Sequence, residues 1–359
     1  MSTRLDIPTP ALIIDRQRLD RNIGAMARWA GEVGITLRPH AKTHKTPEVA
    51  RLQLEAGAPG LAVATLGEAE TFAEAGVDNL FIAYPLWVGD ATKARRLVAL
   101  AERVHLRVGV DSAEAAGHLG GAVRRTSLEA LIEIDCGHHR SGVRPTAAAA
   151  VADAAARAGL MVVGVFTFPG HGSRPGMPAQ AAKDEADALE EATAKLEAAG
   201  HAVQVRSGGS TPTAHHTVAG IVTEIRPGTY VFNDAQQVAL GTCRAEDLAL
   251  SAVATVVSIP SDDRAVLDAG SKVLGADRPP WLEGYGLLPD FPRATVTSLS
   301  EHHAVVALGT GPGYLRRGDQ VRIVPNHVCN AVNLVDELVV VDEGAIVGTW
   351  QVRARGKNA

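Results

Sequence analysis

Residues 34–45 read GITLRPHAKTHK, a short apolar run followed at once by a cluster of histidines and lysines. The apolar part is typical of a buried strand, and the polar cluster lies where that strand ends. From about residue 11 to residue 240, short apolar runs keep alternating with amphipathic stretches, which indicates repeated βα units. Strands joined by right-handed crossovers form a parallel sheet, and this many in series predict a closed (β/α)8 barrel of the TIM type, an α/β fold.

After about Cys243 the pattern changes to strand-like runs separated by Gly, Pro and Asp, with almost no helical period. Examples are LALSAVATVVSIP (248–260) and ELVVVDEGAIVGTW (337–350). We therefore expect a second, mostly antiparallel β domain. The predicted boundaries are 16–243 for the barrel and 244–359 for the β domain, which residues 1–15 join as an N-terminal strand.

Composition excludes several function classes. The chain of 359 residues carries 40 acidic and 35 basic side chains, which are interspersed, and its formal charge is −5. It has no block of basic residues that could bind along a phosphate backbone, so nucleic acid is not an expected partner. The N-terminus MSTRLDIPTP lacks the apolar core of a signal peptide, and no stretch approaches the ~18 apolar residues that cross a bilayer. We expect a cytoplasmic protein without a membrane partner.

The lysine cluster is the first candidate site. Lys42 lies at the end of an expected barrel strand, where barrels display catalytic groups. Neighbouring cations such as Arg38 and His44 would lower the pKa of a lysine, which favours Schiff-base chemistry with a carbonyl cofactor. The alternative is a solvated basic loop.

Two further motifs suggest binding chemistry. SGGSTPT (207–213) follows a strand, and its glycines and hydroxyls suit a phosphate cradle, although turns use the same residues. In PNHVC (325–329), His327 and Cys329 are two residues apart on a strand-like run, so they share a face, and imidazole and thiolate are common zinc ligands. The alternative for Cys329 is a small buried hydrophobic side chain.

Three segments carry a family resemblance: TPALIID (9–15), RPHAKTHK (38–45) and PNHVCNAVNL (325–334). In this order they resemble the D-serine dehydratase and D-threonine aldolase family, which belongs to the alanine-racemase-like, fold-type III enzymes that use pyridoxal 5'-phosphate (PLP). The resemblance implies a β/α barrel with a β domain and a head-to-tail homodimer. It also implies that Lys42, rather than Lys45, carries PLP as a Schiff base.

The same resemblance assigns further roles. It implies that Gly209, Ser210 and Thr211, with Gly228 and Thr229 of RPGTYVFND (226–234), hold the PLP phosphate. It places Arg140 of DCGHHRSGV (135–143) and His171 of FPGHG (168–172) near the cofactor; the alternative for Arg140 is an ion pair with Asp135 or Glu133. The family usually has a tyrosine where this chain has Phe168, which leaves open how the pyridine nitrogen is satisfied. Finally, His327 and Cys329 form the family's metal site, and cysteine favours zinc over other divalent metals.

These roles suggest a D-serine dehydratase-type reaction on a β-hydroxy D-amino acid. Lys42 removes the Cα proton, zinc assists departure of the β-hydroxyl, and the products are a 2-oxo acid and ammonia. A D-threonine aldolase-type reaction uses the same groups but cleaves the Cα–Cβ bond to give glycine and an aldehyde. Other hypotheses are a non-catalytic PLP carrier and a zinc hydrolase built on a barrel.

Overall fold

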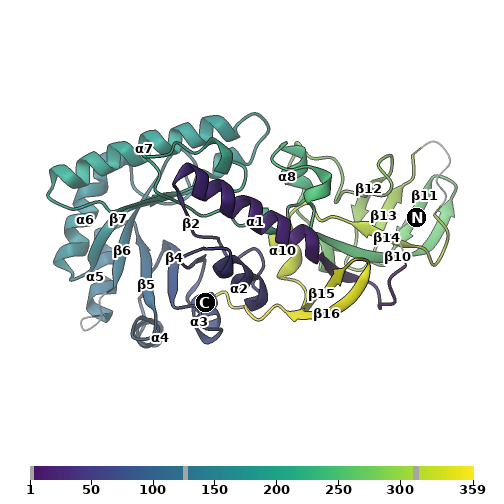
Figure 1. Ribbon diagram of the computed structural model, residues 1–359, viewed down its shortest axis with the longest axis horizontal. Helices are drawn as coiled ribbons and strands as arrows, with labels where there is room; N and C mark the ends of the chain where they lie inside the picture. Colours follow the sequence, from purple (N-terminus) through teal and green to yellow (C-terminus); the bar gives the residue numbers. More distant parts are fainter. Residues whose placement is uncertain (1–3, 124–127, 310–314) are drawn as a thin grey trace. The chain divides into compact units, whose positions relative to one another are not determined.

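The computed structural model describes residues 4–123, 128–309 and 315–359 (Figure 1). The chain forms two compact units, which we call the barrel unit and the β unit. The barrel unit comprises Met26–Lys42, Val49–Gly228 and Gly356–Ala359; the β unit comprises Met1–Ala25, Thr43–Glu48 and Thr229–Arg355. These units follow contacts within the chain rather than catalytic role, so the domain boundaries expected from the sequence stay a prediction.

The barrel unit contains an eight-stranded sheet in the order β2-β9-β8-β7-β6-β5-β4-β3, with every neighbouring pair parallel. An isolated parallel bridge between His40 and Ala62 joins the end of β2 to β3 and closes the ring. The expected barrel is thereby confirmed. The strands are β2 Thr36–Leu37, β3 Leu61–Val63, β4 Asn79–Pro85, β5 His105–Val110, β6 Glu129–Ile134, β7 Met161–Thr167, β8 Val205–Gly208 and β9 Glu224–Ile225.

Helices connect these strands and cover the outside of the sheet, as α5, α6 and α7 do beside β6 and β7 (Figure 1). Several begin at a side-chain cap; for example, Asp90 accepts hydrogen bonds from the backbone of Thr92 and Lys93 at the start of α4. The helices are α1 Arg16–Val33, α2 Pro47–Glu55, α3 Leu66–Glu74, α4 Ala91–Ala101, α5 Ala113–Ala122, α6 Ala148–Arg157 and α7 Pro178–Ala198. In the described part of the chain, none is long and apolar enough to cross a membrane.

The interior of the barrel contains charged as well as apolar side chains. Phe81 and Phe166 pack edge to face with ring centroids 5.1 Å apart, and the buried guanidinium of Arg226 lies 5.6 and 5.5 Å from these rings. Glu224 accepts a 2.7 Å hydrogen bond from Arg38 Nε and a 2.6 Å hydrogen bond from Ser207 Oγ. Buried charges need partners of this kind, because an unpaired charge is costly away from water.

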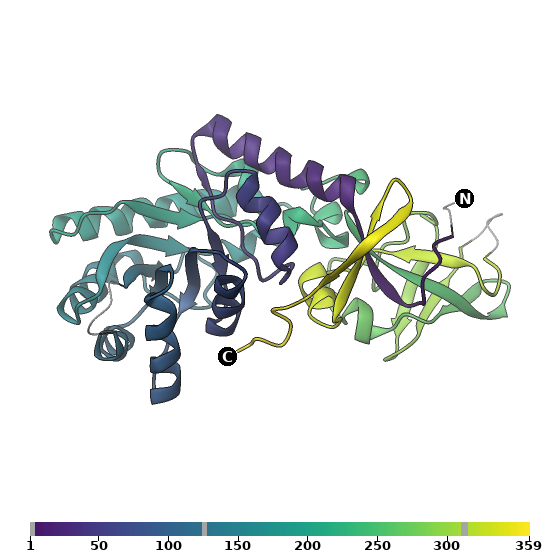
Figure 2. The same ribbon diagram turned by 60° about the horizontal axis from the view of Figure 1, so that its bottom comes forward.

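The β unit contains a second eight-stranded sheet in the order β12-β13-β11-β10-β1-β15-β16, with β14 paired to β10. All pairs are antiparallel except β1 with β15, which confirms a mostly antiparallel sheet. Figure 2 shows the N-terminal strand (purple) beside the C-terminal hairpin (yellow). The strands are β1 Ala11–Asp15, β10 Leu250–Ser261, β11 Arg264–Leu267, β12 Thr295–Leu299, β13 Ala304–Ala307, β14 Gln320–Ile323, β15 Glu337–Asp342 and β16 Ala345–Gln351.

Three short helices complete this unit: α8 Ala235–Ala239, α9 Ser271–Leu274 and α10 Val328–Val332. The last of these corrects an expectation from the sequence. The run 325–334 is not a continuation of strand β14; His327 is instead the residue before the first turn of α10.

Candidate active site

Lys42 lies in the turn that follows β2, at the carboxyl end of the barrel strands. Its Nζ is 5.5 Å from the ring centroid of Phe168, which directly follows β7. The structure therefore brings the lysine to a second strand end, as expected for a catalytic group in a barrel. At this distance an ammonium group is attracted to the face of the ring.

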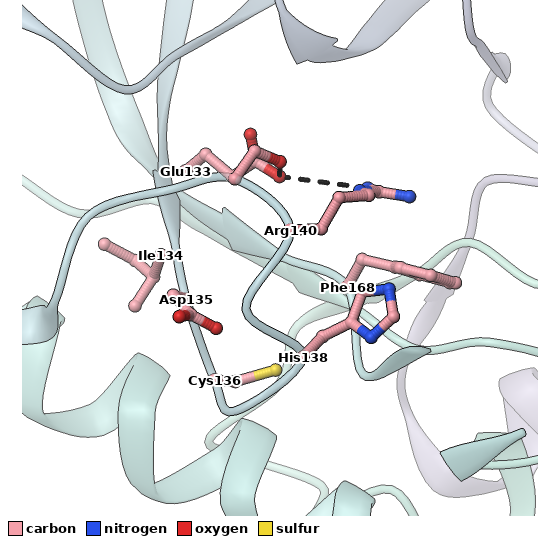
Figure 3. Close-up of a pocket in the computed structure, with 8 residues that line it drawn as sticks. Glu133, Ile134, Asp135, Cys136, His138, Arg140 and Phe168 are labelled. Atoms are coloured by element: carbon pink, nitrogen blue, oxygen red, sulfur yellow. Dashed lines mark hydrogen bonds and ion pairs between the residues drawn. The ribbon is translucent and has the colours of Figure 1, made fainter. Parts of the chain in front are cut away.

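Arg140 approaches the same aromatic ring. Its guanidinium carbon is 4.8 Å from the Phe168 centroid, and its Nη2 is 4.0 Å from Glu133 Oε1 (Figure 3). Asp135, the other partner considered for Arg140, instead accepts hydrogen bonds from the backbone and ring of His139. Of the two ion pairs considered for Arg140, the structure shows the one with Glu133, and it also places Arg140 against the Phe168 ring.

The surroundings of Arg140 form a small cavity lined by strand β6 and the segment after it (Figure 3). Its volume of about 10 Å³ is that of roughly one water molecule. Burial raises the pKa of Glu133, although Ser141 and Arg140 work in the opposite direction. His138 packs edge to face on Phe168 at 5.4 Å, and burial followed by the charges of Arg140 and His171 lowers the pKa of His138.

His171 lies in the turn after β7, three residues beyond Phe168. Its Nε2 is 3.1 Å from Asp184 Oδ2 on α7. This contact fixes the orientation of the imidazole.

The expected phosphate loop follows β8. Gly209 has φ +74°, and a Cβ on it would lie 2.8 Å from Ile225 Cγ2, so the position requires glycine. The loop also closes on itself, because Ser210 N and Ser210 Oγ each lie 2.9 Å from Thr213 Oγ1. Ser210 and Thr211 are both buried. A compact loop with a glycine that no other residue replaces fits a phosphate cradle.

One detail of this loop differs from the expectation. The Gly209 N–H does not turn toward an anion site but donates a 2.7 Å hydrogen bond to Glu185 Oε1 on α7. A Cβ on Gly208 would lie only 2.3 Å from the same oxygen. Gly208 therefore leaves room for the carboxyl group beneath the loop, and the hydroxyls of Ser210 and Thr211 are the candidate phosphate donors.

Sequence reasoning missed Glu185, although a signal existed. Burial raises the pKa of Glu185 to about 7, against the opposing effects of Gly209 N–H and Arg226. Its position falls on the otherwise apolar face of α7, with Ala181, Ala182, Ala188 and Leu189. An acidic residue at a core position of an amphipathic helix indicates a specific polar partner.

The second segment expected to bind phosphate contains Gly228 and Thr229, and the boundary between the two units falls between these residues. Gly228 ends a segment of the barrel unit, in which Arg226 N donates a 2.8 Å hydrogen bond to Gly208 O. Thr229 begins the next segment of the β unit, where its carbonyl accepts a 2.7 Å hydrogen bond from Asn233 N. Within the barrel unit, the segment before Gly228 therefore runs directly beside the phosphate loop.

The expected metal pair lies at the start of α10 in the β unit. His327 Nδ1 is 3.3 Å from Asp234 Oδ2, and Cys329 Sγ is 3.2 Å from the hydroxyl of Thr43, the residue that follows Lys42. Asp234 is fully buried and also accepts hydrogen bonds from the backbone of Val328 and Gln237. A carboxylate beside one ring nitrogen is also common at histidines that bind metals, where it hydrogen-bonds that nitrogen.

The two predicted ligands also interact with each other. The charge of Cys329 raises the pKa of His327 well above its usual value, and Asp234 adds to this effect while burial opposes it. Across residues 4–123, 128–309 and 315–359, no set of three or more His, Cys, Asp or Glu side chains is arranged to hold a metal ion.

Comparisons with known proteins agree with this architecture. Residues 14–236 match the family described as alanine racemase, N-terminal domain, and residues 249–341 match the putative serine dehydratase domain. The chain is 33% identical to D-threonine aldolase from Arthrobacter sp., over 98% of this chain and 93% of the relative. It is 35% identical to D-threo-3-hydroxyaspartate dehydratase from Delftia sp. (strain HT23), over 91% of this chain and 92% of the relative.

A solved structure of D-threo-3-hydroxyaspartate dehydratase, a cysteine-to-alanine mutant in the metal-free form, superimposes with a TM-score of 0.89 at 33% identity, covering 96% of this chain and 97% of that one. The fold and the comparisons thus place the chain among the lyases of the fold-type III pyridoxal-phosphate class. More particularly, the chain belongs to the alanine racemase N-terminal domain family and carries a serine dehydratase domain. The family predicted from the sequence is confirmed.

Proposed function

We propose that this protein is a PLP- and zinc-dependent lyase that converts a β-hydroxy D-amino acid, of the D-serine type, to a 2-oxo acid and ammonia. The observation that carries the proposal is the convergence of Lys42 and Arg140 on the Phe168 ring at the strand ends of the barrel. The relatives named above act on substrates of this class, as an aldolase and a dehydratase.

The residues present fit PLP. Lys42 supplies the amine, and the Gly209 loop, with no room for a Cβ, supplies a compact cradle for the phosphate. When bound, PLP provides an electron sink for the charge that develops at Cα. We assign the cofactor to the following residues: Lys42, Arg140, His171, Gly209, Ser210, Thr211, Gly228 and Thr229.

The residues present also fit a divalent metal. His327 and Cys329 would bind it, and the carboxylate of Asp234 lies 3.3 Å from His327 Nδ1. A thiolate ligand favours zinc, although another divalent metal stays an alternative. The metal supplies Lewis-acid assistance to an oxygen substituent of the substrate. The metal-free form of the related dehydratase supports a metal in this family.

Side chains of the protein have separate roles in the proposed reaction. Lys42 Nζ accepts the Cα proton, and Arg140 contacts the same Phe168 ring as Lys42. The carboxylate of Glu133 holds Arg140 in place.

D-threonine aldolase-type cleavage is the second candidate, because one relative carries that name. Both reactions use the same groups, and the difference lies in whether the Cα proton or the β-hydroxyl proton is removed. Cys329 favours the dehydratase, as a zinc ligand suited to assist a departing hydroxyl. A non-catalytic PLP carrier would have no use for His327, Cys329 or the buried Asp234.

The test is a product assay. The purified protein with PLP and zinc is incubated separately with D-serine, D-threonine and D-3-hydroxyaspartate, and 2-oxo acid plus ammonia are measured against glycine plus aldehyde. We expect a 2-oxo acid whose formation stops with a chelator. Glycine and an aldehyde would establish the aldolase, and no product with an intact PLP spectrum would establish the carrier.

Two lysine variants serve as a matched pair in this assay. Lys42→Ala should lose both turnover and the visible absorbance of lysine-bound PLP. Lys45→Ala should keep the absorbance, since Lys45 Nζ is hydrogen-bonded to Ala354 O in the β unit. The reverse result would move the cofactor to Lys45.

We further propose that the protein acts in the cytoplasm as a homodimer and binds neither nucleic acid nor membrane. This rests on the even distribution of 35 basic and 40 acidic side chains and on the resemblance of the family. Sedimentation of the PLP-loaded protein tests the assembly: a monomer at all micromolar concentrations would contradict it.

A further inference from the structure

Glu185 is a buried titratable group that the proposed reaction does not use. It is fully buried on α7, and Oε1 accepts the Gly209 N–H at 2.7 Å. In the described part of the chain, Oε2 has no hydrogen-bond partner. A carboxylate with one unsatisfied oxygen away from water is costly when ionised and much less so when protonated.

Two titratable side chains from other elements are electrostatically coupled to Glu185. Arg226, after β9, is the only cation among them, but its guanidinium donates to Ser207 Oγ and to Thr167 O, both at 2.5 Å. Cys136, after β6, is a buried thiol whose pKa is raised to about 12. Burial is the largest cause and the charge of Glu185 adds to it, while a hydrogen bond with Thr167 acts in the opposite direction. Arg226 thus acts on Glu185 only through its charge, and no described side chain forms an ion pair with Glu185.

The loop above Glu185 is the assigned phosphate cradle. Ser210 and Thr211 directly follow Gly209, the residue that Glu185 holds. A phosphate ester carries nearly two negative charges at neutral pH. A dianion placed there disfavours a second negative charge beneath the loop.

Resting on the proposed function, we propose that Glu185 takes up a proton from solvent when the dianionic phosphate group of the cofactor binds the 207–213 loop. Cofactor affinity is therefore linked to pH. In acid, Glu185 is already neutral and binding carries no electrostatic penalty. In alkali, Glu185 is ionised before binding. The dianion must then bind near a negative charge, or Glu185 must take up a proton at a low proton concentration, so the affinity for the cofactor falls.

The experiment measures the dissociation constant of PLP, by absorbance, for the wild type and Glu185→Gln from about pH 6 to about pH 9. Glutamine keeps an acceptor for Gly209 N–H but cannot ionise. Because both proteins bind the same PLP, the titration of PLP itself affects both dissociation constants equally and does not change their ratio. We expect a ratio near one in acid that rises to roughly tenfold tighter binding by the variant in alkali, since one unit of coupling is tenfold.

Three controls make the result decisive. Glu191→Gln, at an exposed position of α7, should match the wild type at every pH. Pyridoxal, which lacks the phosphate, should give a pH-independent ratio for Glu185→Gln. Calorimetry of the wild type in two buffers of different ionisation enthalpy should show more proton uptake with PLP than with pyridoxal, and this readout does not depend on the variant.

The outcomes separate this inference from the proposed function. If the wild type forms no lysine-bound PLP spectrum at any pH, the proposed function fails. If PLP binds but the ratio is flat, or if Glu185→Gln binds more weakly throughout, the carboxyl is a fixed support and the proton linkage is wrong. An equal pH dependence with pyridoxal would also overturn it, since Glu185 would then respond to the ring rather than to the phosphate.

Discussion

Phe168 shows how one residue can organise a site without reacting. The ring centroid lies 5.5 Å from Lys42 Nζ and 4.8 Å from the guanidinium carbon of Arg140, so one aromatic ring contacts two cations. The family usually has a tyrosine here, and phenylalanine retains the π face while losing the hydroxyl. The departure from the family pattern therefore preserves the contact with Lys42 and Arg140.

Asp234 gives the first prediction at the scale of single residues. Its Oδ2 is 3.3 Å from His327 Nδ1, and such carboxylates typically change metal affinity by about 10–100-fold when removed. We expect Asp234→Asn to weaken zinc binding by roughly that factor, measured by competition with a chromophoric chelator. Asp290→Asn, which alters a carboxylate paired with Arg322, serves as the control.

An unchanged zinc affinity in Asp234→Asn would show that His327 needs no orienting partner. It would also remove the main structural support for assigning a metal to His327 and Cys329. Loss of zinc binding in both aspartate variants would indicate general destabilisation instead.

At the scale of elements, strands β2 and β9 are held together by charge as well as by two backbone pairs. Burial alone would raise the pKa of Glu224, but the charge of Arg38 and the hydrogen bonds from Ser207 and Arg38 outweigh it and hold the pKa below its usual value of 4.5. The stabilisation is therefore fully present above about pH 4.5 and is lost as pH falls through the lower folded-state pKa.

Glu224→Gln tests this linkage. Removing one partner of a buried ion pair typically costs about 3–5 kcal/mol, so we expect a loss of that order in the free energy of unfolding at neutral pH. The difference from the wild type should shrink in acid, where Glu224 is protonated in both folded and unfolded states. Urea unfolding at a series of pH values measures it, with the exposed Glu197→Gln as control. A difference independent of pH would contradict the assigned cause.

The elements also show what the sequence could and could not predict. The alternation of apolar runs with amphipathic helices predicted the barrel, because parallel strands buried on both faces read as continuous apolar segments. The run 325–334 was wrongly interpreted as a strand, since its apolar residues suit a strand as well as the short helix α10. Glu185 was missed because its partner, Gly209, is 24 residues away and identifiable only in three dimensions.

For the candidate site, local motifs predicted that its segments follow barrel strands, but not the contacts within them. The turn after β2 and the loop after β8 are where the patterns placed them. The pairing of Arg140 with Phe168 depends on the neighbouring ends of β6 and β7, and the contact between His327 and Asp234 joins residues that no periodicity connects. The functional roles themselves stay predictions until the variants are measured.

At the scale of the whole molecule, the β unit is built from both parts of the chain. Strand β1 lies in the sheet between β10 and β15, and Ile14 is completely buried. We expect Ile14→Ala to lower the free energy of unfolding by about 2–5 kcal/mol, as for other large-to-small core changes. Val347→Ala, on the edge strand β16 and 60% exposed, should change it by less than about 0.5 kcal/mol.

Chemical unfolding followed by tryptophan fluorescence measures both variants, because Trp350 lies in β16. Equal effects of the two substitutions would mean that β1 contributes no more than a surface strand. Such a result would contradict the central position of β1 in the sheet.

The central place of β1 also has a consequence for synthesis on the ribosome. Ile13 pairs with Ser251, so this strand is synthesised more than two hundred residues before one of its partners. At typical translation speeds this delay is on the order of tens of seconds. The barrel segments emerge within that interval and contain all their own strands. The nascent chain therefore carries an apolar strand without its final sheet partners until β10 has been synthesised.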